Sequence, residues 1–286
     1  PTGCRLLPAA GPCTEHKRGC AGRFAALCRD PGSDRLTHDI LRCLLRRGPF
    51  ICRQHTAQTK GQNQEYTQHD VEVVTHEAGH AFADYTNRNR VPIGTCGPSL
   101  EACEVHSMSM EYFAEEFADR FFGPDGNKFK YSHLSGSLCF IPYGTMVDHF
   151  QHIVYENPQL TPAERHAKWK ELLAIYQPWM RLDGEIPFYA EGQSWQRQHH
   201  IYSMPFYYID YCLAQTVALQ FWNRIQKDQN DAWKHYMAYT VQGGSVVFTE
   251  LLKNAGLDSP FEGDCLKEVC ETAAKYLDDF DLTGIE

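Results

Sequence analysis

The sequence lacks any apolar run of the roughly 18 residues that a membrane-spanning helix requires. Its first residues do not show the pattern of a secretory signal peptide, and no Asn-x-Ser/Thr glycosylation site occurs in the chain. The chain also lacks an excess of positive charge, because its net charge is -9. This argues against a general nucleic-acid binder. We therefore expect a cytoplasmic protein that binds neither membranes nor nucleic acids.

The cysteines lack the arrangement of a zinc ribbon, since none of the twelve forms a C-x-x-C pair. A chain of 286 residues can bury a core without disulfide bonds, so we interpret the thiols as mostly reduced, as in an intracellular protein. Alternation of polar and apolar residues with a period of two is almost absent as well. The absence of that period predicts a mainly α protein.

The N-terminal part of the chain differs in composition from the rest. Residues 1–60 carry 11 Lys and Arg against 4 Asp and Glu, a net charge of +7, so the remaining residues carry -16. Half of the twelve cysteines also lie there. A Cys/His metal knuckle is disfavoured because the spacings match no zinc template. We expect residues 1–65 to be an atypical basic, Cys/Arg-rich segment, either frameshifted or disordered, followed by a helical domain over residues 66–286.

From about Thr67 the sequence predicts a succession of helices whose ends are marked by Gly, Pro and capping residues. A Gly/Ser-rich stretch, residues 132–137, predicts a loop between two of them. The expected helices cover 70–87, 100–122, 143–156, a segment capped by Thr161, 204–226 and two or three further segments.

The stretch His76-Glu77-Ala78-Gly79-His80 contains the motif H-E-x-x-H. In a helix, His76 and His80 lie one turn apart on the same face, where two imidazoles can bind one metal ion. Glu77 then points to the side where a metal-bound water would lie, and its carboxylate is suited to act as a general base. The motif therefore predicts a zinc hydrolase site on the first helix.

A catalytic zinc usually takes a third protein ligand. The metzincin pattern is excluded, because Ala83 and Thr86 occupy the positions of its glycine and its third histidine. The third ligand must then come from another helix, commonly as a glutamate. The segment 100–122 offers five candidates: Glu101, Glu104, Glu111, Glu115 and Glu116.

Several motifs together resemble those of the thimet oligopeptidase/oligoendopeptidase F family of zinc peptidases, and in particular its bacterial branch. Besides H-E-x-x-H they are the segment Glu104-Val-His-Ser-Met-Ser-Met-Glu111 and the segments 148–152, 155–158, 195–198 and 200–211. The resemblance extends from about Val71 to the C-terminus. It implies a helical zincin-type (Glu-zincin) catalytic domain over residues 66–286, with at most a small β element.

The resemblance also implies how the site is built. It gives one zinc ion per chain, with His76, His80 and Glu104 as its ligands. Glu111 is expected beside a ligand histidine, which it would orient; a solvated helix glutamate is the alternative.

A downstream histidine and tyrosines bind the substrate and its developing oxyanion in this family. The matching residues are His200, Tyr207 and Tyr211, although His199 is an alternative to His200 and Tyr208 is an alternative tyrosine. A phenol with a pKa of about 10 remains a neutral hydrogen-bond donor at pH 7.

His149 and His152 could form a second metal pair, but a hydrogen-bonded structural role is the preferred interpretation because no third ligand is close in sequence. The family's turn and apolar strand, which come just before H-E-x-x-H, have only Pro49-Phe50-Ile51 as a counterpart. We expect a zinc-dependent endopeptidase that hydrolyses short peptides. The alternative is a catalytically impaired fragment that binds zinc or peptide without turnover.

Overall fold

The computed structural model of the chain describes residues 67–281. All of these residues belong to one compact unit. The expectation for residues 1–65 therefore lies outside the described residues.

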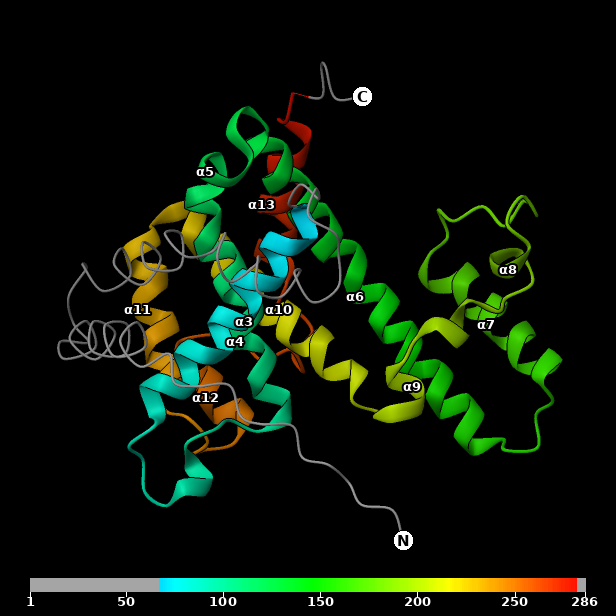
Figure 1. The fold of residues 1–286 in the computed structure, drawn as a ribbon, viewed down its shortest axis with the longest axis horizontal. Helices are drawn as coiled ribbons and strands as arrows, with labels where there is room; N and C mark the ends of the chain where they lie inside the picture. The colour runs from blue at the N-terminus through cyan, green and yellow to red at the C-terminus, as the bar shows by residue number, and fades with distance from the viewer. Residues whose placement is uncertain (1–66, 282–286) are drawn as a thin grey trace, which may run out of the picture. The chain divides into compact units, whose positions relative to one another are not determined.

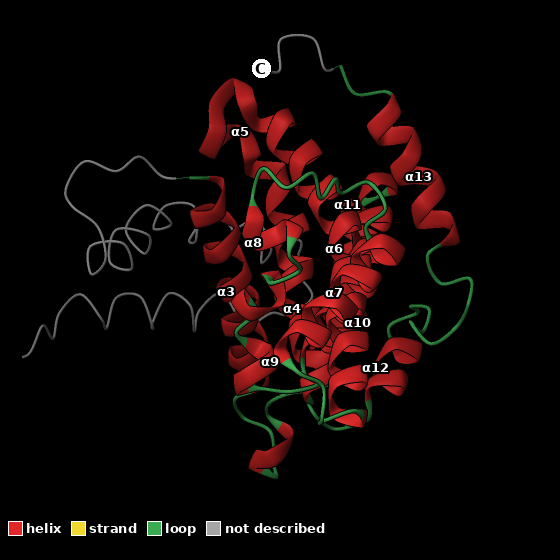
Figure 2. Ribbon diagram, turned by 90° about the vertical axis from the view of Figure 1, so that its right-hand side faces the viewer, coloured by secondary structure: helices red, strands yellow, loops and turns green. Residues whose placement is uncertain are grey.

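Over residues 67–281 the structure contains helices and connecting loops and no β-strand (Figure 2), which confirms the mainly α prediction. No described helix combines the length and the apolar character needed to cross a bilayer. The helices are α3 (Gln68–Asn87), α4 (Leu100–Ala114), α5 (Ala118–Phe122), α6 (Gly126–Glu156), α7 (Pro162–Tyr176), α8 (Pro187–Ala190), α9 (His200–Ser203), α10 (Tyr208–Lys227), α11 (Gln229–Thr240), α12 (Phe248–Asn254) and α13 (Lys267–Asp278). Four short 3-10 turns join them: η1 (Ile93–Thr95), η2 (Glu115–Phe117), η3 (Gly123–Asp125) and η4 (Ser194–Arg197).

The helix that carries H-E-x-x-H begins at a capping box. The side chain of Thr67 accepts a hydrogen bond from the backbone N–H of Asp70, and the carboxylate of Asp70 accepts one from the backbone N–H of Thr67. Such reciprocal bonds satisfy backbone donors that the first turn leaves unpaired. The predicted start at residue 70 is therefore two residues late.

Helix α4 lies at the centre of the fold, packed against α10 on one side and α3 on another (Figure 1). One buried cluster joins α4, α6, α10 and α13 through seven residues, and a second joins α6, α7 and η4 through another seven. The first comprises Tyr112, Leu134, Ala218, Leu219, Trp222, Val269 and Ala273, and the second comprises Met146, Val147, Phe150, Trp169, Leu172, Leu173 and Trp195. The long helix α6 contributes to both clusters and so links them.

The loop predicted over residues 132–137 is wrong, because α6 runs through it without a break. Leu134 is completely buried in the first cluster, and His133 is 7% exposed. The packing of these side chains outweighs the low helix propensity of the Gly and Ser residues around them. Helix α6 also accommodates Pro142 in its interior.

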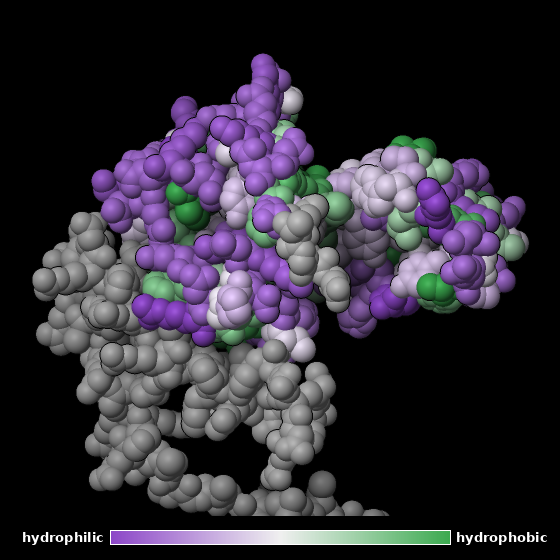
Figure 3. All heavy atoms as spheres, turned by 90° about the horizontal axis from the view of Figure 1, so that it is seen from above, coloured by the Kyte–Doolittle hydropathy of each residue, from purple (hydrophilic) through white to green (hydrophobic). Residues whose placement is uncertain are grey.

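Two other predicted helices have different bounds in the structure. The segment 100–122 forms α4, the turn η2 and the short helix α5, and the segment 204–226 begins later, as α10 at Tyr208, after the separate turn α9. The face seen in Figure 3 is covered mainly by hydrophilic residues, with hydrophobic ones scattered among them.

Candidate metal centre and cleft

Helices α3 and α4 approach closely at Gly79, the second variable position of H-E-x-x-H. A Cβ atom at this position would lie 2.4 Å from the backbone oxygen of His106 and 2.6 Å from the Cα of Ser107. Only a residue without a side chain fits there. The close approach brings the middle of α4 against α3 beside its two histidines.

The side chains of His76, His80 and Glu104 converge on one point. Oε2 of Glu104 lies 3.2 Å from Nε2 of His76 and 3.3 Å from Nε2 of His80. One ligand atom from each residue lies within 4.8 Å of the other two, and among the described residues this is the sole group of three or more such donors. Two imidazoles and a carboxylate are a donor set that Zn²⁺ favours in hydrolases, so the residues fit a zinc ion.

Two further contacts hold these donors in place. Ser107, which is completely buried, donates from Oγ to Oε2 of Glu104 over 2.9 Å. Nδ1 of His76 lies 2.7 Å from Oε1 of Glu111, which is the contact expected for Glu111. Because an ionised carboxylate only accepts hydrogen bonds, Nδ1 of His76 donates to Glu111, and its Nε2 points toward Glu104.

The charges of the site favour a cation. Burial lowers the pKa of His76, but hydrogen bonds to Glu104 and Glu111 outweigh this effect and raise that pKa to about 10. Burial raises the pKa of Glu104, but hydrogen bonds to His76 and His80 outweigh the effect of burial. They hold the pKa of Glu104 well below its usual range. Burial likewise raises the pKa of Glu111, but hydrogen bonds to His133 and His76 outweigh burial and lower it. The carboxylates of Glu104 and Glu111 therefore remain ionised at neutral pH and attract positive charge.

A cleft of about 860 Å³ opens beside the three donors. Glu77, which is exposed, lines it together with His76, His200 and Tyr211. These four side chains come from α3, α9 and α10, so helices distant in sequence supply the walls. The proposed base and two of the proposed oxyanion-binding residues thus face one space.

His200 lies among the tyrosines and His199 does not line the cleft. The His200 ring lies 5.5 Å from the Tyr211 ring and 6.5 Å from the Tyr207 ring, centroid to centroid. Gln198 accepts a hydrogen bond from Tyr143 at Oε1, so its Nε2 donates to Nδ1 of His200 over 2.8 Å. The hydrogen of a neutral His200 ring is therefore on Nε2, which makes Nε2 a donor. Burial and the neighbouring His199 lower the pKa of His200, which favours this neutral form.

The three tyrosines have different surroundings. The hydroxyl of Tyr207 donates to Oε1 of Glu104 over 2.9 Å and lies 3.6 Å from Sγ of Cys103. Tyr211 lines the cleft, and burial raises its pKa to about 12, so its hydroxyl stays protonated at neutral pH. Tyr208 packs edge-on against the Tyr143 ring at 6.1 Å and does not line the cleft.

The second histidine pair has hydrogen-bonding partners of its own. Nδ1 of His149 lies 3.0 Å from the Tyr176 hydroxyl, and Nε2 of His152 lies 3.4 Å from Oδ2 of Asp148. Neither histidine belongs to a group of three metal-binding donors within residues 67–281. These contacts agree with the structural role expected for the pair.

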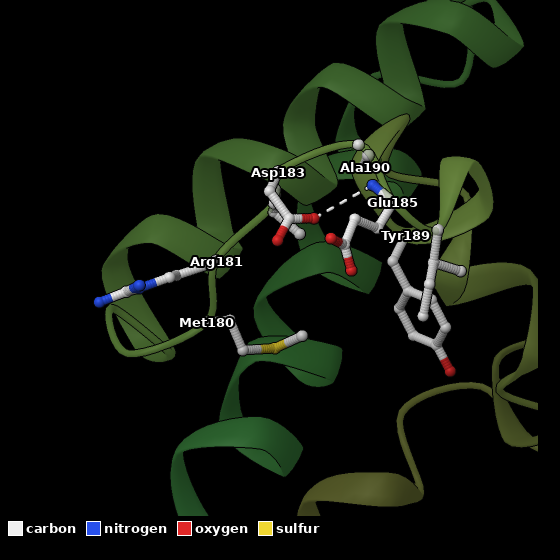
Figure 4. Close-up of a pocket in the computed structure, with 9 residues that line it drawn as sticks. Met180, Arg181, Asp183, Glu185, Tyr189 and Ala190 are labelled. Carbon is white, nitrogen blue, oxygen red and sulfur yellow. Dashed lines mark hydrogen bonds between the residues drawn. The ribbon is translucent and has the colours of Figure 1, made fainter.

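A separate hollow of about 510 Å³ is formed by the loop that follows α7 and by α8 (Figure 4). Within it, the carboxylate of Asp183 accepts a hydrogen bond from the backbone N–H of Glu185 over 3.1 Å. None of the predicted site residues lines this hollow.

Sequence reasoning missed the partners that lie behind Glu111. Its other carboxylate oxygen, Oε2, is 2.9 Å from Nε2 of His133, and Nδ1 of His133 is 2.8 Å from Oε1 of Glu115. Glu115 was one of five candidate carboxylates, but His133 lay in the predicted loop. A helical reading of residues 132–137 would have been needed to bring His133 toward Glu111.

A helical domain that carries H-E-x-x-H on one helix and a convergent glutamate on the next has an arrangement typical of metallopeptidases. A sequence model of peptidase family M3 matches residues 19–270 of the chain. The chain therefore belongs to peptidase family M3, and the resemblance recognised in the sequence is confirmed.

The chain is similar to several known proteins. An oligoendopeptidase F homolog of Borreliella burgdorferi is 24% identical over 197 residues, which are 66% of this chain and 32% of that protein. The solved structure of PZ peptidase A with an inhibitor is 46% identical, covering 77% of this chain and 39% of that one, with a TM-score of 0.72. A protein of Bacillus anthracis strain Ames, provisionally assigned as oligoendopeptidase F, is 42% identical over 77% of this chain and 36% of its own, with a TM-score of 0.65. The chain thus spans about a third to two fifths of the length of these relatives.

Proposed function

We propose that the chain is a zinc-dependent metalloendopeptidase that hydrolyses short peptides. The observation that carries this proposal is the convergence of His76, His80 and Glu104 at the edge of a cleft that Glu77 also lines. The chain's membership of peptidase family M3 and its similarity to oligoendopeptidases support the same activity.

His76, His80 and Glu104 would hold one zinc ion per chain. When bound, zinc supplies a Lewis acid that polarises the scissile carbonyl and makes a water molecule more acidic. Glu111 keeps Nε2 of His76 directed at the site through its hydrogen bond to Nδ1. Ser107 keeps Oε2 of Glu104 directed at the site through the hydrogen bond that its Oγ donates.

Glu77 would act as the general base. It is exposed to the cleft, and its carboxylate takes the proton of the attacking water and later gives a proton to the leaving amine. His200 and Tyr211, or Tyr207, donate hydrogen bonds to the oxyanion that develops on the substrate carbonyl. Each such donor typically contributes about 3 kcal/mol to the stability of the transition state.

A cytoplasmic location and a role in peptide catabolism are part of the proposal. All six cysteines among residues 67–281 are free thiols, which is usual for proteins of a reducing compartment.

Cleavage of a short fluorogenic peptide tests the proposal. We expect the purified chain to hydrolyse the peptide, to lose activity in a chelator and to regain it when zinc is restored. Glu77→Gln should keep zinc but lower kcat by roughly 10²–10⁴-fold, because the amide can bind water but cannot accept its proton.

The outcomes separate the proposal from its alternative. A wild-type chain that binds zinc but leaves the peptide intact would favour an impaired fragment without turnover, which is the alternative because the chain spans only part of its relatives. A Glu77→Gln variant as active as the wild type would overturn the mechanism.

A further inference from the structure

A continuous line of hydrogen-bonded side chains begins at His76, passes through Glu111 and His133, which also line the cleft, and ends at the buried Glu115. It runs from Nδ1 of His76 to Oε1 of Glu111 over 2.7 Å and from Oε2 of Glu111 to Nε2 of His133 over 2.9 Å. The last contact joins Nδ1 of His133 to Oε1 of Glu115 over 2.8 Å. The four side chains come from α3, α4, α6 and η2, so the line ties four segments together.

Both ring nitrogens of His133 face carboxylate oxygens. An ionised carboxylate offers only acceptors, so both nitrogens must donate, and a histidine with two N–H groups is an imidazolium. Burial lowers the pKa of His133, but the hydrogen bonds to Glu111 and Glu115 outweigh burial and raise it to about 10. The line therefore holds one buried positive charge between two negative ones.

The ring of His133 is fixed by its neighbours as well as by its hydrogen bonds. It stacks on Phe129 with a centroid distance of 5.6 Å and an angle of 9° between the rings. The Tyr112 ring lies 4.7 Å away on α4. His133 and Glu115 are each 7% exposed, so water has little access to either side chain.

We infer that His133 and Glu115 are positioning residues of the metal centre. His133 fixes the Glu111 carboxylate with one nitrogen, Glu111 fixes the His76 ring, and Glu115 balances the charge of His133 with an ion pair on its other nitrogen. The inference rests on the proposed zinc site, and it extends the support of His76 beyond the glutamate that touches it. Groups that orient a metal-binding histidine typically change metal affinity by about 10–100-fold when replaced.

The test is the zinc dissociation constant of the full chain, measured by competition with a chromophoric chelator. Glu115→Gln keeps a hydrogen-bond acceptor for His133 but removes the charge, and we expect it to raise the Kd for zinc by about 10-fold or more. Glu116→Gln is the matched control, because Glu116 is the adjacent carboxylate and bonds to Gln229 outside the line. Its Kd should stay within about twofold of the wild type. Circular dichroism establishes that each variant is folded at the temperature of the titration.

A double-mutant cycle shows whether His133 acts through Glu111. The variants are His133→Gln, Glu111→Gln and the pair together. We expect the double variant to raise the Kd for zinc scarcely more than Glu111→Gln alone, because His133 acts on His76 through the Glu111 carboxylate. Additive losses, or an unchanged Kd in folded Glu115→Gln, would overturn the inference and leave the proposed zinc site intact. A wild-type chain that binds no zinc would overturn the proposed function itself.

Discussion

Tyr207 and Tyr211 lie one turn apart with ring centroids 5.1 Å from each other. Tyr207 donates to the Glu104 carboxylate, and Tyr211 lines the cleft. We expect Tyr211→Phe to lower kcat by about 100-fold with little change in KM or melting temperature, because its contact with the oxyanion exists only in the transition state. Tyr207→Phe should also weaken zinc binding, because it removes a hydrogen bond to a proposed ligand. His200→Ala should behave like Tyr211→Phe.

Steady-state kinetics on a peptide substrate and a thermal melt together check this prediction. Tyr276→Phe is a suitable control, because Tyr276 packs against Trp222 of the first buried cluster and does not line the cleft. If both Phe variants of the cleft turned over peptide at the wild-type rate, the tyrosines would be packing residues and their proposed role would be wrong.

Individual residues of the site were predictable where the signal is local in sequence. His76, Glu77 and His80 follow from one helical turn, whereas Glu104 required the family resemblance to single it out from five glutamates. His133 could not be found, since its contact with Glu111 depends on how α6 packs against α4. Nor could the sequence decide between His199 and His200, which are neighbours whose rings face different surroundings.

At the scale of the helices, we expect replacement by alanine to have opposite effects on stability at Gly79 and at Gly136. Gly79→Ala places a methyl group 2.4 Å from the His106 backbone oxygen, so α3 and α4 must move apart. We expect a loss of about 1–3 kcal/mol in the free energy of unfolding together with weaker zinc binding. Gly136 is exposed inside α6 with no atom within 4 Å of an added Cβ. Gly136→Ala should therefore stabilise the protein by about 0.5–1 kcal/mol.

Chemical denaturation of both variants, followed by circular dichroism, measures the two changes. A stable Gly79→Ala variant with unchanged zinc affinity would contradict the close approach of α3 and α4. A destabilised Gly136→Ala variant would contradict the helical assignment of residues 132–137.

That assignment shows why helix boundaries were harder to predict than helix types. Most predicted helices exist, because their apolar spacing and caps are properties of the segment itself. The 132–137 segment has the composition of a loop, and only the burial of Leu134 and His133 against other helices explains why it is helical. The break between α9 and α10 likewise depends on tertiary contacts: Phe206 adopts a φ of 64° there, and its backbone N–H donates to Oε1 of the buried Gln151.

At the scale of the whole molecule, the lack of period-two alternation and the order of the motifs together predicted the helical fold and the family. The role of residues 1–65 stays a prediction, because it lies outside the described part of the chain. Residues 67–281 contain all three side chains of the proposed metal centre, His76, His80 and Glu104.

The zinc content of the purified chain tests this account most directly. After dialysis against trace zinc, elemental analysis should find close to one zinc ion per chain in the wild type and in Glu77→Gln. His76→Ala, His80→Ala and Glu104→Ala should each lose it, since three protein ligands are the usual minimum for a tight catalytic site. A wild-type chain without zinc, or a Glu104→Ala variant that retains all of it, would contradict the assignment of His76, His80 and Glu104 as the metal ligands.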